Sequence, residues 1–227
     1  MAHNGRVTHD APVPPVDLPT TPALVLRGQR FDAGRPAVMA IVNRTRDSFF
    51  VTAGADALEP ALDALADAVA VGADIVDVGG VRAGQEGEWV DVPAEIARVR
   101  PFLAAARERF PDLVLSLDTW RSEVLAACAD VGVDLVNDTW AGADPELAAA
   151  AADLGAGYVV SHTGGLPPRT DPVDVSYGAD PDDVVRSVVD GLRAGAARAV
   201  AAGGRAGAGA AGRTHDRREG TRSSPRG

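Results

Sequence analysis

The stretch VMAIVNRTRDSF, residues 38–49, decides the fold class of this chain. Its apolar first half is typical of a buried strand, and this strand ends at Asn43. A polar, turn-forming loop with Thr45, Asp47 and Ser48 follows. Ligands of parallel α/β folds bind at the carboxyl ends of the strands. The loop is therefore a candidate binding site.

The rest of the chain repeats a strand, a helix and a glycine stop. Short apolar runs predict five strands, and apolar spacings of three and four residues predict the helices between them. Gly72, Gly132 and Gly155 end predicted helices. This alternation predicts a parallel sheet with crossover helices. The five predicted strands are Ala37–Val42, Ile75–Val78, Val114–Leu117, Leu135–Val136 and Tyr158–Val160.

Flanking segments complete the predicted organisation. Two short apolar runs around Gly28 predict a hairpin before the sheet, and a last helix runs out near Ala202. We therefore expect a TIM-type (β/α) barrel that is incomplete, with about five of eight strands, and that leaves an exposed sheet edge. The expected domain limits are a disordered leader at 1–21, the barrel at 22–202 and a disordered Gly/Arg-rich tail at 203–227.

The tail differs sharply in composition from the rest. Apart from Pro225, residues 203–227 contain no aliphatic or aromatic residue larger than alanine, so they cannot offset the entropy cost of ordering. Six arginines against two acids suggest one reading, a basic arm that contacts an acidic partner or phosphate. We favour the other reading, a disordered tail that arises from a shifted reading frame or a miscalled gene end.

Composition excludes several classes of protein. The net charge of −10 argues against nucleic acid as the main partner, because a duplex binder needs a basic face. The sequence has no run of eighteen apolar residues, and residues 1–20 lack the apolar segment of a secretory signal. We therefore expect no membrane span. Cys128 is the only cysteine, so no internal disulfide can form, and we expect a cytoplasmic location. The absence of lysine excludes Schiff-base catalysis.

Polar side chains also follow later strands. Asp118 can accept hydrogen bonds from ring N–H groups, or it can cap the helix that begins near Arg121. Asn137 offers a donor and an acceptor suited to the edge of a heterocycle, or it forms a turn with Asp138. His162 lies at a strand end, where a hydrogen-bonded structural histidine is the simpler interpretation. None of these signals is specific alone.

Together, however, five motifs in order resemble those of dihydropteroate synthases. The first resembles the family's Gly-Ile-Val-Asn-Val-Thr-Pro-Asp-Ser-Phe signature and departs from it at Ala40, Arg44 and Arg46. The resemblance extends over about Ala23 to Ala202. The other four motifs are Asp74–Gly80, Ser116–Trp120, Leu135–Thr139 and Val160–Gly165.

The loop after the second motif diverges from the family. Ala83 stands where the family has its substrate-contacting threonine, and Gly84 stands where it has an arginine, with Arg82 as a neighbouring substitute. In this respect the chain looks like the divergent second-copy paralogues of the family rather than its folate-making members.

The resemblance implies a function in folate biosynthesis. It implies a transferase that joins 6-hydroxymethyl-7,8-dihydropterin diphosphate to 4-aminobenzoate with the help of Mg²⁺. It further implies that Asp118 and Asn137 bind the pterin and that Asn43 is a metal ligand. The expected partners are these small molecules, with no nucleic acid and no membrane, and a homodimer is left open.

Later family motifs are absent, so the chain looks C-terminally truncated. It lacks the Gly-Phe-Gly-Lys loop, the pterin-binding lysine and the Arg-x-His pair that holds the diphosphate. Single charged contacts of this kind contribute roughly 2–4 kcal/mol, so we expect little or no synthase activity. Three alternatives stay open: a non-catalytic paralogue that binds a pterin or a partner, a pterin-dependent methyltransferase-type domain, and a fragment that closes its barrel with another chain.

Overall fold

The computed structural model describes residues 23–44, 58–82, 89–170 and 175–204. Several predictions fall outside these residues: the leader, nearly all of the tail, the loop from Thr45 to Ser48, and Ala83 with Gly84.

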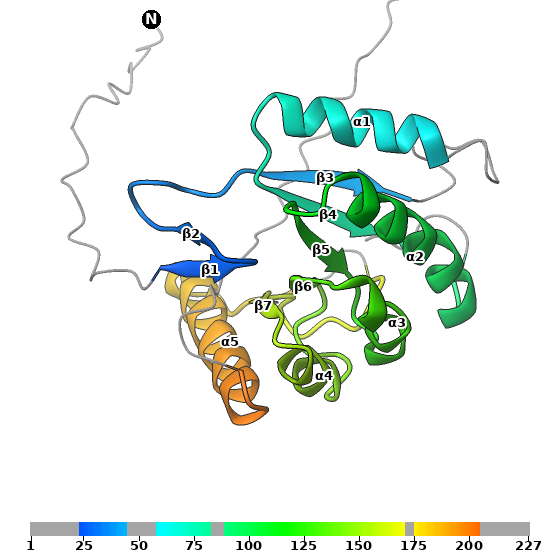
Figure 1. Cartoon of the computed structure of the whole chain (residues 1–227). Helices are drawn as coiled ribbons and strands as arrows, with labels where there is room; N and C mark the ends of the chain where they lie inside the picture. Colours follow the sequence, from blue (N-terminus) through cyan, green and yellow to red (C-terminus); the bar gives the residue numbers. More distant parts are fainter. Residues whose placement is uncertain (1–22, 45–57, 83–88, 171–174, 205–227) are drawn as a thin grey trace, which may run out of the picture.

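Five strands form one parallel sheet in the order β3-β4-β5-β6-β7 (Figure 1). Each strand except the last is followed by a helix that leads to the next strand, as predicted, and α5 follows β7. The strands are β3 (Met39–Asn43), β4 (Ile75–Gly79), β5 (Val114–Asp118), β6 (Leu135–Asp138) and β7 (Gly157–Val160). The helices are α1 (Leu58–Ala70), α2 (Val92–Arg109), α3 (Ser122–Ala127) with the 3₁₀ turn η2 (Ala129–Val131), α4 (Leu147–Asp153) and α5 (Pro181–Ala201).

A small antiparallel hairpin precedes the sheet, as expected. It consists of β1 (Leu24–Leu26) and β2 (Gln29–Phe31). Arg27 and Gly28 both have positive φ, 47° and 75°, which is the geometry of a two-residue type I′ turn. Glycine accepts this conformation without strain, so the hairpin turns where the sequence places Gly28.

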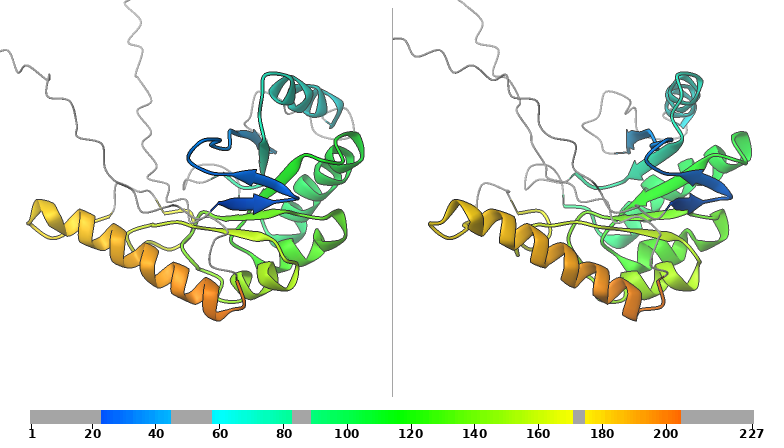
Figure 2. Two further views of the ribbon diagram at one scale, coloured as in Figure 1. Left: turned by 60° about the vertical axis from the view of Figure 1, so that its left-hand side comes forward. Right: turned by 90° about the vertical axis from the view of Figure 1, so that its left-hand side faces the viewer.

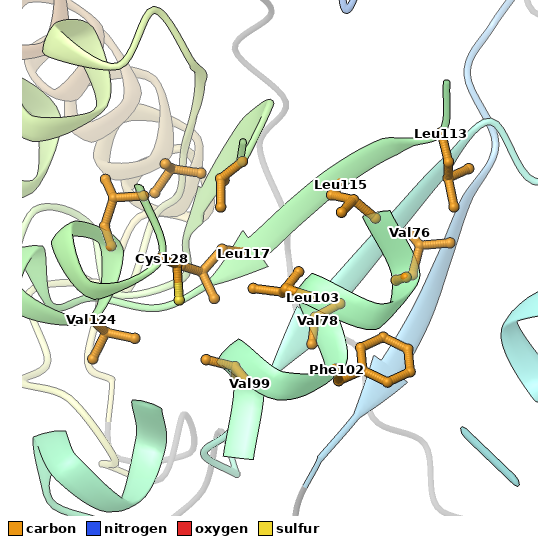
Figure 3. Packing of buried hydrophobic residues seen from close by; sticks show 14 of the residues in the cluster. Val76, Val78, Val99, Phe102, Leu103, Leu113, Leu115, Leu117, Val124 and Cys128 are labelled. Carbon is orange, nitrogen blue, oxygen red and sulfur yellow. The ribbon is translucent and has the colours of Figure 1, made fainter. Parts of the chain in front are cut away.

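The outer face of the sheet carries the larger core. Alternate strand residues such as Val76, Leu115 and Val136 point toward the helices and are completely buried. They pack in one cluster with Phe102 of α2 and Val124 of α3, both labelled in Figure 3. This face therefore holds the helices in place, and it leaves the opposite face to form the barrel interior.

The inner face is apolar at its amino-terminal end. There Leu26 and Phe31 of the hairpin cover a layer of strand residues. All are nearly buried, so the hairpin seals this end of the interior. The strand residues of this layer are Ile75, Val114, Leu135 and Val159.

Four of the five strands extend one or two residues beyond their predicted carboxyl ends, and β7 ends at Val160 as predicted. β6 continues to Asp138 instead of ending at Val136. The polar residues Asn137 and Asp138 are 2% and 1% exposed because both side chains have hydrogen-bond partners inside the fold. These polar residues therefore lie at the carboxyl end of β6 and do not terminate the strand.

Asp134 joins three elements below the sheet. Its carboxylate pairs with Arg27 of the hairpin at 3.2 Å and with Arg107 of α2 at 2.6 Å. It also accepts a hydrogen bond from the backbone N–H of Leu115 at 3.0 Å. The carboxylate is mostly buried, so its loss removes the ion-pair partner of two arginines and the hydrogen-bond acceptor of one amide.

We therefore expect Asp134→Asn to lower the free energy of unfolding by about 2 kcal/mol. Urea denaturation followed by circular dichroism measures this change. Asp63→Asn is the matched control, because Asp63 pairs with Arg109 at the surface and is 70% exposed. The control is expected to change stability by less than about 0.5 kcal/mol. Equal losses in both variants would contradict this role of Asp134.

Candidate functional site

A layer of polar side chains lies above the sealed apolar layer. Asp77, Ser116 and Asn137 come two residues after Ile75, Val114 and Leu135 on their strands, so they point to the same inner face. The three polar residues are only 1%, 0% and 2% exposed. A buried carboxylate is stable in such a place only if hydrogen bonds satisfy it.

Two neighbouring strands supply those hydrogen bonds. Ser116 Oγ donates to Asp77 Oδ1 at 2.5 Å, and Asn137 Nδ2 donates to Asp77 Oδ2 at 2.8 Å. These bonds fix the orientation of the Asn137 amide, with its nitrogen toward Asp77. Asn137 lies within β6, so the alternative that it forms a turn with Asp138 is wrong.

Asp118 occupies the next layer, at the carboxyl end of β5. Its carboxylate is half-buried, and Oδ1 accepts a hydrogen bond from Thr139 Oγ1 at 3.0 Å. Gly79 faces it from β4, where a Cβ atom would lie 3.1 Å from Asp118 Oδ2. The absence of a side chain at Gly79 thus leaves room for this carboxylate at the mouth of the interior.

The alternative role of Asp118 as a helix cap is wrong. The residue before α3 is Arg121, and its side chain makes no capping bond. The first backbone N–H of α3, that of Ser122, donates instead to Asp144 Oδ2 at 2.7 Å. A residue from a distant loop performs the capping, which leaves Asp118 directed toward the interior with Thr139.

Asn43 lies at the exposed carboxyl end of β3, beside Gly79 in the sheet register. An amide oxygen in this position suits Mg²⁺, which usually takes one or two protein oxygens together with water and substrate phosphates. The described residues contain no group of three or more histidine, cysteine or acidic side chains that could hold a metal by themselves. Asn43 therefore fits as one ligand among water and phosphate oxygens.

Glu95 of α2 positions the loops around this mouth. Its buried carboxylate accepts hydrogen bonds from Thr119 Oγ1 at 2.7 Å and from Arg121 at 2.5 Å, just after Asp118. Burial raises the pKa of Glu95, and these two partners oppose the shift. Gly80 packs on the same residue, since a Cβ at Gly80 would lie 3.2 Å from Glu95 Cγ.

His162 belongs to a different part of the molecule. Its ring stacks on Tyr177 with centroids 6.2 Å apart and lies 3.5 Å from Ser187 Oγ of α5. Burial lowers the pKa of His162. The residue lines a cavity of about 670 Å³ between α5 and the loops after β6 and β7, which none of Asn43, Asp118 and Asn137 lines. These contacts agree with a structural histidine.

The structure therefore brings Asp118 and Asn137 side by side, as register partners on the adjacent strands β5 and β6, with Asn43 at the same end of the sheet. Asp77 and Ser116 lie in two of the predicted motifs, but neither was assigned a role. Strand alternation could have indicated them. Asp77 lies two residues before Gly79, and Ser116 lies two residues before Asp118, so each shares the face of a residue at the mouth. Their burial as a pair could not be recognised before the strands were aligned.

Comparison with known proteins agrees with this geometry. A family model described as "Pterin binding enzyme" matches residues 39–207. The chain belongs to the pterin-binding enzyme family. A relative from Mycobacterium leprae, named "Inactive dihydropteroate synthase 2", is 51% identical over 179 residues. The match covers 79% of this chain and 61% of that relative.

Solved structures of this pterin-binding family show the same fold. The dihydropteroate synthase of Yersinia pestis, in a sulfonamide drug complex, has a TM-score of 0.68 and 31% identity, over 80% of this chain and 64% of that one. The enzyme of Xanthomonas albilineans with 4-aminobenzoic acid has a TM-score of 0.66 and 31% identity, over 82% and 64%. The predicted incomplete TIM-type barrel and the resemblance to second-copy paralogues are thus confirmed.

The match extends over less than two thirds of these relatives. In the part that the structure describes, no helix has both the length and the apolar character needed to cross a lipid bilayer.

The polar layer makes a prediction about pH. Asn137→Asp would place a second carboxyl group against Asp77 in a buried site, which raises the pKa of one member of the pair above its value in the unfolded chain. The folded variant then binds more protons than the unfolded variant. Its free energy of unfolding is therefore highest at low pH and falls as pH rises through the raised pKa. We expect a loss of roughly 3 kcal/mol at about pH 8 and a much smaller loss at about pH 5.

Urea denaturation of the variant and the parent at the two pH values measures this difference. Asn43→Asp is the control, since it adds a carboxylate at an exposed strand end. A pH-independent loss in Asn137→Asp, or the same pH dependence in the control, would contradict the buried arrangement around Asp77.

Proposed function

We propose that this protein binds a pterin at the carboxyl end of the sheet and that it has little or no dihydropteroate synthase activity. The observation that carries the proposal is the placement of Asp118 above the buried polar layer of Asp77, Ser116 and Asn137. The polar layer lies above the end that the hairpin seals, and Asp118 is the half-buried carboxylate at the mouth of the interior.

The chemistry of these groups suits a pterin. The pyrimidine edge of a pterin carries N–H donors, and a carboxylate accepts hydrogen bonds through both of its oxygens. Thr139 holds one Asp118 oxygen in place, and the lack of a side chain at Gly79 makes room for the other oxygen. The apolar side chains below exclude water, which strengthens polar contacts at the mouth. A flat heterocycle that enters edge-on would place its donors against Asp118.

Catalysis requires more than this pocket. In the reaction implied by the family, the amine of 4-aminobenzoate attacks the pterin methylene carbon while the C–O bond to diphosphate breaks. The departing anion needs cationic groups, and the chain has no lysine. Arg44, directly after β3, lies over the Phe102 ring at 5.5 Å, on the helix side of the sheet. The relative from M. leprae is likewise named inactive.

Mg²⁺, where bound, would neutralise charge on a diphosphate. Asn43 is the described residue that we assign to it, as one oxygen ligand at the end of β3. Since the chain lacks lysine and the family's Arg-x-His pair, we expect the metal alone to support only weak binding of a pterin diphosphate.

The proposal predicts that Asp118→Asn weakens pterin binding by about 10- to 150-fold, which corresponds to roughly 1.5–3 kcal/mol for a hydrogen bond to a charged group. Isothermal titration calorimetry with 6-hydroxymethylpterin measures the affinity. Asp63→Asn serves as the control, because it removes one surface carboxylate on α1 and leaves the interior unchanged. Unfolding curves of both variants establish that they remain folded.

Two results would overturn the proposal in different ways. Absence of pterin binding by the parent protein would reject the site. Synthesis of dihydropteroate at an ordinary enzymatic rate, from the pterin diphosphate, 4-aminobenzoate and Mg²⁺, would reject the assignment as inactive.

We also propose a cytoplasmic location and a homodimeric state. The first rests on the lone cysteine, Cys128, which is buried and free of disulfide bonding. The second rests on the outward face of α5, where Val185 and Val200 are 60% and 50% exposed.

A further inference from the structure

The cavity between α5 and the loops after β6 and β7 is large enough for a small organic molecule. Its volume is about 670 Å³, within the range of about 300–1,000 Å³ that ligand pockets occupy. The amino-terminal half of α5 projects beyond the body of the domain (Figure 2), and residues of this helix form one wall of the cavity. The cavity shares no residue with the pterin site proposed above.

Arg198 of α5 brings a positive charge to this cavity. Its Nη2 donates a hydrogen bond to the backbone carbonyl of Ala141 at 3.1 Å, which orients the guanidinium. Within the described part of the chain, no carboxylate forms an ion pair with Arg198. A guanidinium carries five N–H donors, so most of them remain available to a ligand.

The loop after β6 is shaped around this guanidinium. Gly142 has a φ of 81°, and a Cβ atom there would lie 3.1 Å from Arg198 Nη2. Ala141 has a φ of 55°, a left-handed conformation that is unfavourable for alanine. Two contacts hold it, the bond from Arg198 to its carbonyl and a bond from its N–H to Ser161 Oγ at 3.1 Å. Strained backbone of this kind gathers at ligand sites.

Asp138 lies behind the same loop and is already satisfied. Its carboxylate accepts hydrogen bonds from the backbone N–H groups of Trp140 and Gly142, at 3.0 and 2.6 Å. It accepts a third from the hydroxyl of Tyr158 at 2.6 Å. Asp138 therefore anchors the loop, and the guanidinium of Arg198 stays on the cavity side.

His162 and Ser187 add polar groups without a second charge. Ser187 Oγ lies 3.5 Å from His162 Nε2. Because burial lowers the pKa of His162, its ring is neutral at neutral pH. The lining therefore suits a ligand that carries a single negative charge.

The remaining wall of the cavity is largely apolar. Trp140, Leu166 and Pro167 contribute to it. The Trp140 ring is fixed edge-on against Trp120, with ring centroids 6.3 Å apart. Thr163 Oγ1 donates to the carbonyl of Leu166 at 3.3 Å, which closes the turn that carries Leu166. A wall held in this way provides a contact surface for an apolar group.

We propose that this cavity binds a small organic carboxylate. Arg198 binds the carboxylate group, and the wall of Trp140, Leu166 and Pro167 contacts the apolar body of the ligand. A carboxylate and a guanidinium are both planar and can form two parallel hydrogen bonds. A phosphate carries more charge and is less suited to a lining with one arginine. The site does not depend on pterin binding, so its failure would leave the proposed function standing.

Nuclear magnetic resonance of the isotope-labelled full chain, titrated with phenylacetate, tests the site. We expect saturable shifts of the Trp140 indole N–H and of the Gly142 and Gly165 amides. Phenylacetamide, which has the same shape but no charge, is expected to bind at least about tenfold more weakly, because it lacks the charged acceptor.

Two variants test the residues. Arg198→Gln is expected to weaken phenylacetate binding at least about tenfold. Arg193→Gln is its control, because Arg193 lies on the same helix, is 79% exposed and does not line the cavity. Ala194→Phe fills the cavity from an exposed position of α5 while Arg198 stays, and it is expected to abolish binding. Circular dichroism establishes that all three variants remain folded.

Several results would overturn the proposal. Absence of saturable shifts in the parent, or shifts confined to the residues around Asp118, would reject the cavity as the site. Equal affinities of the parent and Arg198→Gln, or of phenylacetate and phenylacetamide, would reject the role of the charge. Tighter binding of inorganic phosphate than of phenylacetate at the same residues would reject the carboxylate class.

Discussion

The carboxylate of Asp77 is stable inside the sheet only because β5 and β6 donate hydrogen bonds to it. This constraint divides the interior into two parts. Below it the hairpin seals an apolar layer, and above it Asp118 reaches the mouth with Thr139. The bond from Asn137 to Asp77 also fixes the amide that the family resemblance assigns to the pterin. The candidate site therefore depends on a buried polar contact that itself touches no solvent.

The helices on the outer face stabilise this site without taking part in it. Glu95 of α2 accepts hydrogen bonds from Thr119 and Arg121, which follow Asp118, so the loop is held from outside the barrel. At the opposite end of the sheet, Asp134 joins the hairpin to α2 and β5. The carboxyl end of the sheet is polar, whereas the end that the hairpin seals carries the ion pairs of Asp134. This division is typical of (β/α) barrels, in which stability and function occupy opposite ends.

Much of this arrangement was predictable from strand and helix periodicity. The five parallel strands, the hairpin and the positions of Asn43, Asp118 and Asn137 at strand ends follow from apolar runs that stop at polar residues. The strand limits were less accurate, because Asn137 and Asp138 continue β6 through bonds to distant residues. The partners of such polar groups lie on other strands, and no local pattern records them. The roles of Asp77 and Ser116 in the buried polar layer were not predicted for the same reason.

The sequence alone determined the family, the order of the motifs and the lack of lysine, since these are properties of composition and spacing. Only the tertiary structure decided between the alternatives for Asp118 and Asn137. Asp144, from a separate loop, caps α3 in place of Asp118, and the amide of Asn137 is bound within a strand and not a turn. It also decided that Gly195 of α5 packs against Val160 of β7, while Val185 and Val200 face outward. Such choices depend on which surfaces meet across the fold, because hydrogen bonding and burial are satisfied by residues far apart along the chain.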